Sequence, residues 1–147
     1  TNDAPSSLTR LHDLGVQPFL TAATILGVLA QRLVRQLCPH CKQESFLNEQ
    51  EWQHLATDYP LPRPEFVFKA VGCEECRHTG YKGRIGIYEF MPLSLTTKQL
   101  IGANANLNEL RQQAKKEGVE PLRIAGARKI LEGVTTLEEV LRVVPLN

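Results

Sequence analysis

The 147-residue sequence lacks a marked excess of charge of either sign. Lys and Arg number 17 and Asp and Glu 16, so the formal net charge is +1, and aromatic residues make up only 6%. Domains that bind nucleic acid usually carry clustered Lys and Arg, and those that bind single strands add aromatic side chains on which bases stack. The composition therefore argues against a nucleic-acid partner, and so against a zinc-ribbon domain that binds nucleic acid.

The sequence also lacks the short motifs of several enzyme classes. The patterns GxxxxGK[ST], GxGxxG, GxSxG and HExxH do not occur in it. The first two are the glycine-rich loops that cradle phosphates, and the others mark a serine nucleophile and a catalytic zinc. We therefore predict no catalytic residue in this chain and no nucleotide hydrolysis by the chain alone.

No signal peptide or clear membrane segment is visible. The chain opens on TNDAPSS without an initiator Met, so we expect a piece of a longer chain or a processed one. The longest uncharged stretch, Leu14–Gln31, has 18 residues, which approaches the length of a membrane span. It contains Gln17 and Pro18 and is followed by Arg32, so a buried helix of a globular protein is the better interpretation.

The hydrophobic pattern and the Pro, Gly and capping signals predict a mainly α fold with one small β-hairpin. The long central helix should be buried at its start and emerge at its end, where Arg32 and Arg35 would form surface salt bridges. Capping boxes are expected at Asn48/Glu51, Asn106/Glu109 and Thr135/Glu138. The predicted helices are Pro5–Leu14, Pro18–Leu37, Asn48–Tyr59, Thr96–Ala103, Leu107–Glu117, Pro121–Glu132 and Leu137–Val144, and the hairpin pairs Phe66–Val71 with Ile85–Phe90.

All four cysteines fall in two C-x-x-C pairs, Cys38/Cys41 and Cys73/Cys76, which 31 residues separate. A C-x-x-C turn aims two sulfurs at one point, and two such turns supply the four thiolates of a tetrahedral Zn²⁺ site. A site with four protein ligands leaves no open position for a substrate, so the zinc would be structural. Chelation should then unfold residues 38–90. Disulfides or a redox pair are the alternatives.

Two histidines, His40 and His78, lie in or beside these turns and could each replace a cysteine as a ligand. Four thiolates already complete the site, so solvated histidines near the metal are the preferred interpretation.

The second cysteine pair is followed by HTGYKGR, in which Gly80 and Gly83 stand three residues apart. Glycine permits positive φ, so the stretch is typical of a sharp turn leading into a strand. The alternative is that the glycines keep the backbone clear so that Arg84 reaches a phosphate, for which a guanidinium is well suited. The residues alone favour the turn.

Four stretches in this order carry a family resemblance: TNDAPSSLTRL, LGVLAQRLVRQLCPHCK, GCEECRHTGYKGRIGIYE and LEGVTTLEEVLRV. They resemble the C-terminal part of the bacterial ATPases of type II secretion and type IV pilus assembly, over essentially the whole chain. The tetracysteine pattern is the specific mark of the type II secretion and pilus-extension members. LGVLAQRLVR is more similar to the type II secretion branch, and TND matches the residues just after the family's histidine box.

The resemblance implies a division into three parts. Residues 1–37 would end a RecA-like ATPase core, 38–90 would form the tetracysteine metal-binding sub-domain, and 91–147 would form a helical C-terminal sub-domain. Arg84 matches an arginine that the family places near the bound nucleotide. Walker A, Walker B and the histidine box would precede this chain, which should be inactive alone.

The resemblance also implies partners and a location. The full enzyme would be a cytoplasmic homohexamer that binds ATP and Mg²⁺ and works against platform proteins at the inner membrane. The chain would complete the nucleotide cleft and pass conformational change to the platform. In an incomplete chain, the apolar face of Pro18–Gly27 should be exposed. The alternative function is a free-standing zinc-stapled module for protein interaction.

Overall fold

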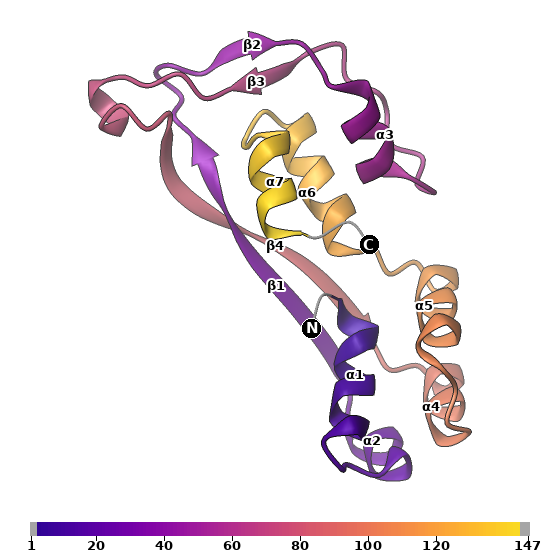
Figure 1. Cartoon of the computed structure of the whole chain (residues 1–147). Coiled ribbons are helices and arrows are strands. Elements are labelled where there is room, and N and C mark those ends of the chain that lie inside the picture. The colour runs from indigo at the N-terminus through magenta and orange to yellow at the C-terminus, as the bar shows by residue number, and fades with distance from the viewer. Residues whose placement is uncertain (1–2, 145–147) are drawn as a thin grey trace. The chain divides into compact units, whose positions relative to one another are not determined.

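The structure, a computed structural model, describes residues 3–144. Within this range it contains seven α-helices, one short 3-10 helix and four strands (Figure 1). Helices are the commonest elements, as predicted, but the β content exceeds one hairpin. In chain order the elements are α1 (Ala4–Asp13), α2 (Pro18–Thr24), β1 (Gly27–Leu37), β2 (Gln43–Ser45), α3 (Glu49–Ala56), β3 (Val67–Lys69), η1 (Glu74–Cys76), β4 (Tyr81–Pro92), α4 (Leu95–Gly102), α5 (Leu107–Lys116), α6 (Leu122–Leu131) and α7 (Leu137–Val143).

The strands form two separate two-stranded sheets, so the predicted hairpin is wrong in its pairing. β3 falls inside the predicted strand Phe66–Val71, but its partner is β2, with Glu44 opposite Phe68 in an antiparallel register. The predicted partner, Ile85–Phe90, belongs to the longer strand β4, which pairs with β1. Two segments that lie far apart in the sequence therefore make the longer sheet.

The single helix predicted over Pro18–Leu37 is also wrong. The helix α2 ends at Thr24, and the chain continues as the eleven-residue strand β1. The segment starts with an uninterrupted apolar run, which is compatible with a strand as well as with a helix, and pairing with β4 decides between them. A Cβ on Gly27 would lie 3.1 Å from the Phe90 ring, so the absence of a side chain allows this close approach.

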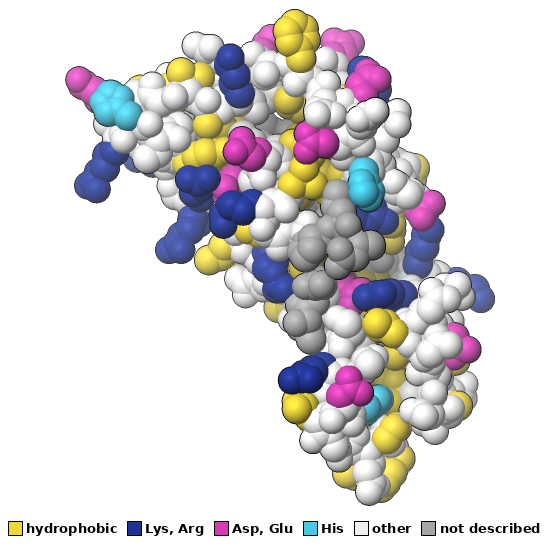
Figure 2. All heavy atoms as spheres, viewed as in Figure 1, with side chains coloured by type: hydrophobic (Ala, Val, Ile, Leu, Met, Phe, Trp, Pro, Cys, Tyr) yellow, Lys and Arg dark blue, Asp and Glu magenta, His cyan; other side chains and the backbone are white. Residues whose placement is uncertain are grey.

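The apolar start of this segment is not buried. Phe19, Leu20 and Leu26 are 62%, 46% and 82% exposed, which contradicts the buried helix and confirms the exposed apolar face expected for Pro18–Gly27. Figure 2 shows hydrophobic side chains reaching the surface at the end that carries α2. No described helix is both long and apolar enough to cross a membrane.

The chain divides into two compact units. The first combines Thr1–Gln31 with Tyr88–Pro121, and its core lies between α1, α4, α5 and the end of β4. Its buried side chains are Ala4, Leu8, Met91, Leu93, Ile101, Leu110 and Ala114. Packing of α2 on α4 and of α1 on α5 completes this unit.

The second unit combines Arg32–Ile87 with Leu122–Asn147. In it, α3 packs on α6 and α6 packs on α7 (Figure 1). A Cβ on Gly126 would lie 2.5 Å from Val140, so this glycine lets α6 and α7 approach closely. The Arg123 side chain of α6 donates to the Leu55 carbonyl at 2.6 Å and holds the end of α3. The predicted three-part division stays a prediction, and its residues 1–2 and 145–147 lie outside the described range.

Helix capping was predicted correctly at α5 and one residue too early at α7. Asn106 and Glu109 form the expected capping box, and at α3 the Asn48 side chain accepts from the Glu51 N–H. At α7 the cap is Thr136, which accepts from the Glu139 N–H at 3.0 Å, and not the predicted Thr135/Glu138 pair.

Candidate metal centre

The two C-x-x-C turns lie at the ends of the paired strands β1 and β4. Cys38 directly follows β1, and the Lys42 N–H donates to its carbonyl at 3.1 Å to close the first turn. Cys73 caps the start of η1 and Cys76 is its last residue, and the His78 N–H donates to the Cys73 carbonyl at 2.7 Å. The second turn leads into β4 five residues after Cys76.

The structure brings all four predicted ligands together. The four sulfurs lie within 4.8 Å of one another, and three of the separations are 3.7 Å for Cys38–Cys73, 3.8 Å for Cys41–Cys76 and 3.7 Å for Cys73–Cys76. A zinc ion bound tetrahedrally at about 2.3 Å from each sulfur requires sulfur separations of about 3.8 Å. All four cysteines are free, so no disulfide competes for these sulfurs. The residues present therefore fit a Zn²⁺ ion.

Backbone N–H groups point at two of the sulfurs. The Gly72 N–H donates to Cys41 Sγ at 3.3 Å, and the N–H groups of Cys73 and Gly80 each donate to Cys76 Sγ at 3.2 Å. Such donors stabilise the negative charge of a thiolate, which is the form that binds a metal. They also fix the direction in which each sulfur points.

The pKa values of the Cys73 and Cys76 thiols are shifted in opposite directions. Burial raises the pKa of Cys76, but the N–H groups of Cys73 and Gly80 outweigh burial and lower that pKa to about 6. Burial raises the pKa of Cys73 to about 11, and the neighbouring thiols add to the rise. The Cys76 thiol therefore loses its proton more readily than the Cys73 thiol, and a metal ion would displace the protons that remain.

Two glycines allow the second turn to close. Gly72 has φ +121°, and a Cβ there would lie 3.0 Å from the His78 carbonyl oxygen. Gly80 has φ +81°, and a Cβ there would lie 2.5 Å from Ala70 Cβ. Gly83 also has positive φ, +83°. The turn that the sequence predicted is therefore confirmed at Gly80, whereas Gly83 lies within β4.

The other predicted site residues lie outside the cluster. His40 and His78 are exposed, and among the described residues the group that could hold a metal contains the four cysteines only. Arg84 is exposed on β4. Its nucleotide contact stays a prediction.

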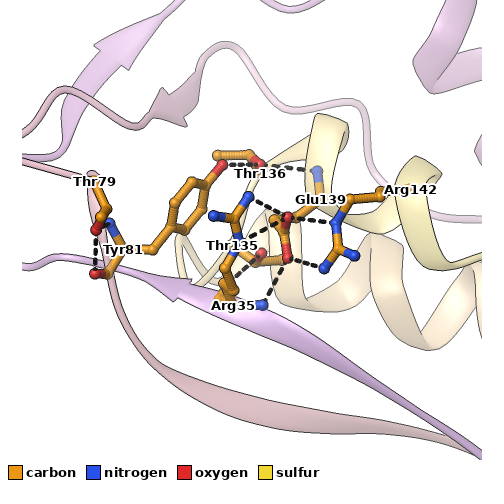
Figure 3. A network of polar contacts seen from close by, with 7 residues as sticks. All are labelled: Arg35, Thr79, Tyr81, Thr135, Thr136, Glu139 and Arg142. Atoms are coloured by element: carbon orange, nitrogen blue, oxygen red, sulfur yellow. Dashed lines mark hydrogen bonds and ion pairs between the residues drawn. The ribbon is translucent and has the colours of Figure 1, made fainter.

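Sequence reasoning missed a polar network around a buried carboxylate beside this site. It joins Arg35, Tyr81, Thr136, Glu139 and Arg142, and Glu139 is 1% exposed (Figure 3). Arg35 does form a salt bridge, as predicted, but from a strand and with a buried partner. The sequence does carry a signal for this network, which is the capping pair Thr136 and Glu139 at the start of α7. The prediction placed this cap at Thr135 and Glu138, and therefore did not single out the two network residues.

Comparison with known proteins identifies relatives over the whole chain. The family described as Type II/IV secretion system protein matches residues 1–142. The chain is 74% identical over its full length to the type IV pilus assembly ATPase TfpB of Acinetobacter baylyi, and covers 25% of that protein. It is 46% identical, over 97% of its length, to the type II secretion system protein E of Pseudomonas aeruginosa, and covers 28% of it.

A third relative is the type IV pilus assembly ATPase PilB of Myxococcus xanthus. The identity is 41% over 96% of the chain, which covers 25% of that protein. The chain thus spans about a quarter of the length of these relatives. Both pilus assembly and type II secretion occur among their names.

Proposed function

The chain belongs to the family of type II/IV secretion system proteins, and from this premise we propose that it is the C-terminal portion of an ATPase that powers type IV pilus assembly or type II secretion. The observation that carries the proposal is the family match over residues 1–142 together with the four clustered cysteines. The match favours this function over a free-standing zinc-stapled interaction module.

Within that ATPase, the four cysteines hold one structural zinc ion. The sulfur separations of 3.7–3.8 Å and the N–H groups aimed at Cys41 and Cys76 support this assignment. When bound, the ion supplies charge neutralisation and a cross-link between the end of β1 and the start of β4. It takes no part in hydrolysis because four protein ligands leave no open position.

The two branches of the family differ in the machine they serve. LGVLAQRLVR favours type II secretion, whereas the relative at 74% identity is named for pilus assembly. The identity extends over every residue of this chain, and the type II secretion relative reaches 46%. We give the whole-chain identity more weight, and pilus assembly is therefore the favoured machine.

The whole protein is proposed to act as a homohexamer in the bacterial cytoplasm. It would bind ATP and Mg²⁺ through RecA-like cores supplied by the rest of the polypeptide. Residues 1–37 would end such a core, and residues 38–90 and 91–147 would move with it and act on platform proteins at the inner membrane. Arg84 would reach the nucleotide from β4, because it is exposed there and carries a fork of donors suited to phosphate.

Replacement of Arg84 tests this proposal in the full-length protein. Arg84→Ala should lower ATP turnover by about tenfold or more, as expected when a cation that stabilises phosphate charge is removed. Zinc content should stay at one per chain, because Arg84 lies outside the cysteine cluster. The measurement is steady-state ATP turnover together with metal analysis of the same sample.

Lys82→Ala is the matched control. Lys82 is an exposed cation two residues away that pairs with Glu75 at 4.0 Å. Its loss should leave turnover unchanged. Unchanged ATP turnover in Arg84→Ala would contradict the role of Arg84 at the nucleotide site. Steady ATP turnover by the 147-residue chain alone would contradict the proposal that this chain lacks the catalytic motifs.

A further inference from the structure

A single buried carboxylate ties α7 to the strand that leads into the first cysteine turn. Glu139 accepts the Arg35 backbone N–H at 2.8 Å and the Arg35 Nε and Nη2 groups at 3.0 and 2.8 Å. It also accepts Arg142 Nε and Nη2 at 2.9 and 3.0 Å. Five donors therefore converge on one side chain that is 1% exposed (Figure 3).

The same helix end is tied to the strand that leaves the second cysteine turn. Thr136 Oγ1 accepts the Glu139 N–H and lies 2.9 Å from the Tyr81 hydroxyl. The Arg35 guanidinium stacks over the Tyr81 ring at 4.2 Å. Tyr81 is the first residue of β4, so the network contacts both β1 and β4 next to the cysteine turns.

From Tyr81 the contacts continue to a cysteine ligand. Thr79 Oγ1 accepts the Tyr81 N–H at 3.1 Å and donates to the Cys76 carbonyl at 2.7 Å. Between them, the Gly80 N–H donates to Cys76 Sγ at 3.2 Å, and the Gly80 carbonyl accepts the Cys38 N–H at 3.0 Å. Gly80 thus joins the two cysteine turns directly.

The first turn has its own link to the loop before α7. Leu37, the residue before Cys38, donates its N–H to the Val134 carbonyl at 2.8 Å. Thr135 Oγ1 donates to the Arg35 carbonyl at 2.8 Å. The edge of β1 beside the first cysteine turn is therefore satisfied by residues 134–139.

We propose that Glu139 is a positioning residue for the tetracysteine site: through Arg35, Thr136 and Tyr81 it fixes the strand ends that carry Cys38 and Cys76. The inference rests on the proposed metal function. Its physical basis is that outer-shell hydrogen bonds set the orientation of metal ligands and thereby the retention of the metal. Release of α7 from β1 should therefore loosen the cysteine turns.

The test compares variants of the 147-residue chain for zinc release to an excess of a chromogenic chelator. Glu139→Gln keeps the shape of the side chain but removes its charge, and Tyr81→Phe removes only the hydroxyl that meets Thr136. Glu132→Gln is the matched control, because Glu132 is an exposed carboxylate of the same unit that pairs with Lys129. Glu139→Gln should release zinc about tenfold faster than the wild type, and Glu132→Gln at the wild-type rate.

Hydrogen exchange distinguishes positioning of the site from support of α7 alone. The variants should expose the Cys38 and Gly80 amides to faster exchange in the zinc-loaded chain. Wild-type zinc release and wild-type protection of these two amides in Glu139→Gln, with faster exchange only within α7, would overturn the proposal. If Glu139→Gln does not fold, Tyr81→Phe decides by the same two measurements.

The proposed zinc site and the proposed positioning role of Glu139 can be contradicted by different results. A wild-type chain that retains no zinc would contradict the proposed metal function. When such a chain is folded, the exchange of its Cys38 and Gly80 amides in the wild type and in Glu139→Gln would still decide whether Glu139 holds the turns.

Discussion

At the scale of the residue, Glu139 makes the stability of the fold depend on pH. Burial raises the pKa of its carboxyl, but hydrogen bonds from Arg142 and Arg35 and the charge of Arg35 outweigh burial and lower it from 4.5 to about 2. A lowered folded-state pKa adds stability above the unfolded pKa of 4.5, and this stability is lost as pH falls from 4.5 toward 2. Arg35 and Arg142 are half exposed, so solvent screens part of the effect.

Glu139→Gln should therefore cost about 2 kcal/mol of the free energy of unfolding at pH 7 and almost nothing at pH 2. Urea unfolding at a series of pH values measures the difference between variant and wild type. Asp3 and Glu117 also have lowered pKa values, but they are present in both proteins, so their contribution cancels in that difference. A difference that is the same at pH 7 and pH 2 would show that the charge of Glu139 contributes nothing.

Apart from the four cysteines, Gly80 is the residue whose replacement should damage the metal site most directly, because its N–H donates to Cys76 Sγ. Gly80→Ala places a Cβ 2.5 Å from Ala70 Cβ and 3.0 Å from the Val71 nitrogen, at a φ of +81°. Clash and backbone strain together should cost about 2–4 kcal/mol of the free energy of unfolding, measured by urea unfolding.

Gly118→Ala separates the two causes. Gly118 has nearly the same φ, +85°, but nothing lies within 4 Å of a Cβ there, so its replacement should cost only about 1 kcal/mol. Equal losses for the two variants would mean that the close approach at Ala70 does not matter.

At the scale of the element, the residue that caps α7 is Thr136 and not the predicted Thr135, and Thr136 also contacts β4. Thr136→Ala removes both the cap on the Glu139 N–H and the contact with the Tyr81 hydroxyl. We expect a loss of about 1 kcal/mol of the free energy of unfolding and faster hydrogen exchange of the Glu139 amide. Thr136→Ser keeps the hydroxyl and should restore protection of that amide, whereas unprotected exchange in the serine variant would argue against capping by Thr136.

Local signals predicted most of the helices, and pairing between distant segments explains the failures. The helix boundaries at α1, α3, α5 and α6 follow from Pro, Asn and Gly at the ends, which act on their immediate neighbours. The strand β1 has no such signal, because Gly27–Leu37 is fixed by β4, more than forty residues away. Apolar periodicity alone does not separate a buried helix from a buried strand.

The candidate site divides in the same way. The spacing of the four cysteines predicted that their sulfurs would meet, because each C-x-x-C turn is a local structure. The support of those turns by Glu139 and Thr136 could not be predicted, since it depends on contacts between residues about a hundred positions apart, such as Arg35 and Glu139. Correct placement of β1 as a strand would have been needed first.

At the scale of the whole molecule, each of the two units has its own core. The four cysteines and the Glu139 network lie in the unit formed by Arg32–Ile87 and Leu122–Asn147. The exposed apolar side chains of α2 and its flanks, Phe19, Leu20 and Leu26, lie in the other unit. A structural metal would therefore stabilise one unit directly, while the core around Leu8 and Met91 lies in the other unit.

The central claim of this account is that Cys38, Cys41, Cys73 and Cys76 together hold one structural zinc ion. The most direct test is X-ray absorption at the zinc edge on the chain purified without added metal. The account predicts one zinc per chain with four sulfur neighbours at about 2.3 Å. A nitrogen or oxygen neighbour in place of a sulfur, or a well-folded chain that holds no zinc, would contradict it.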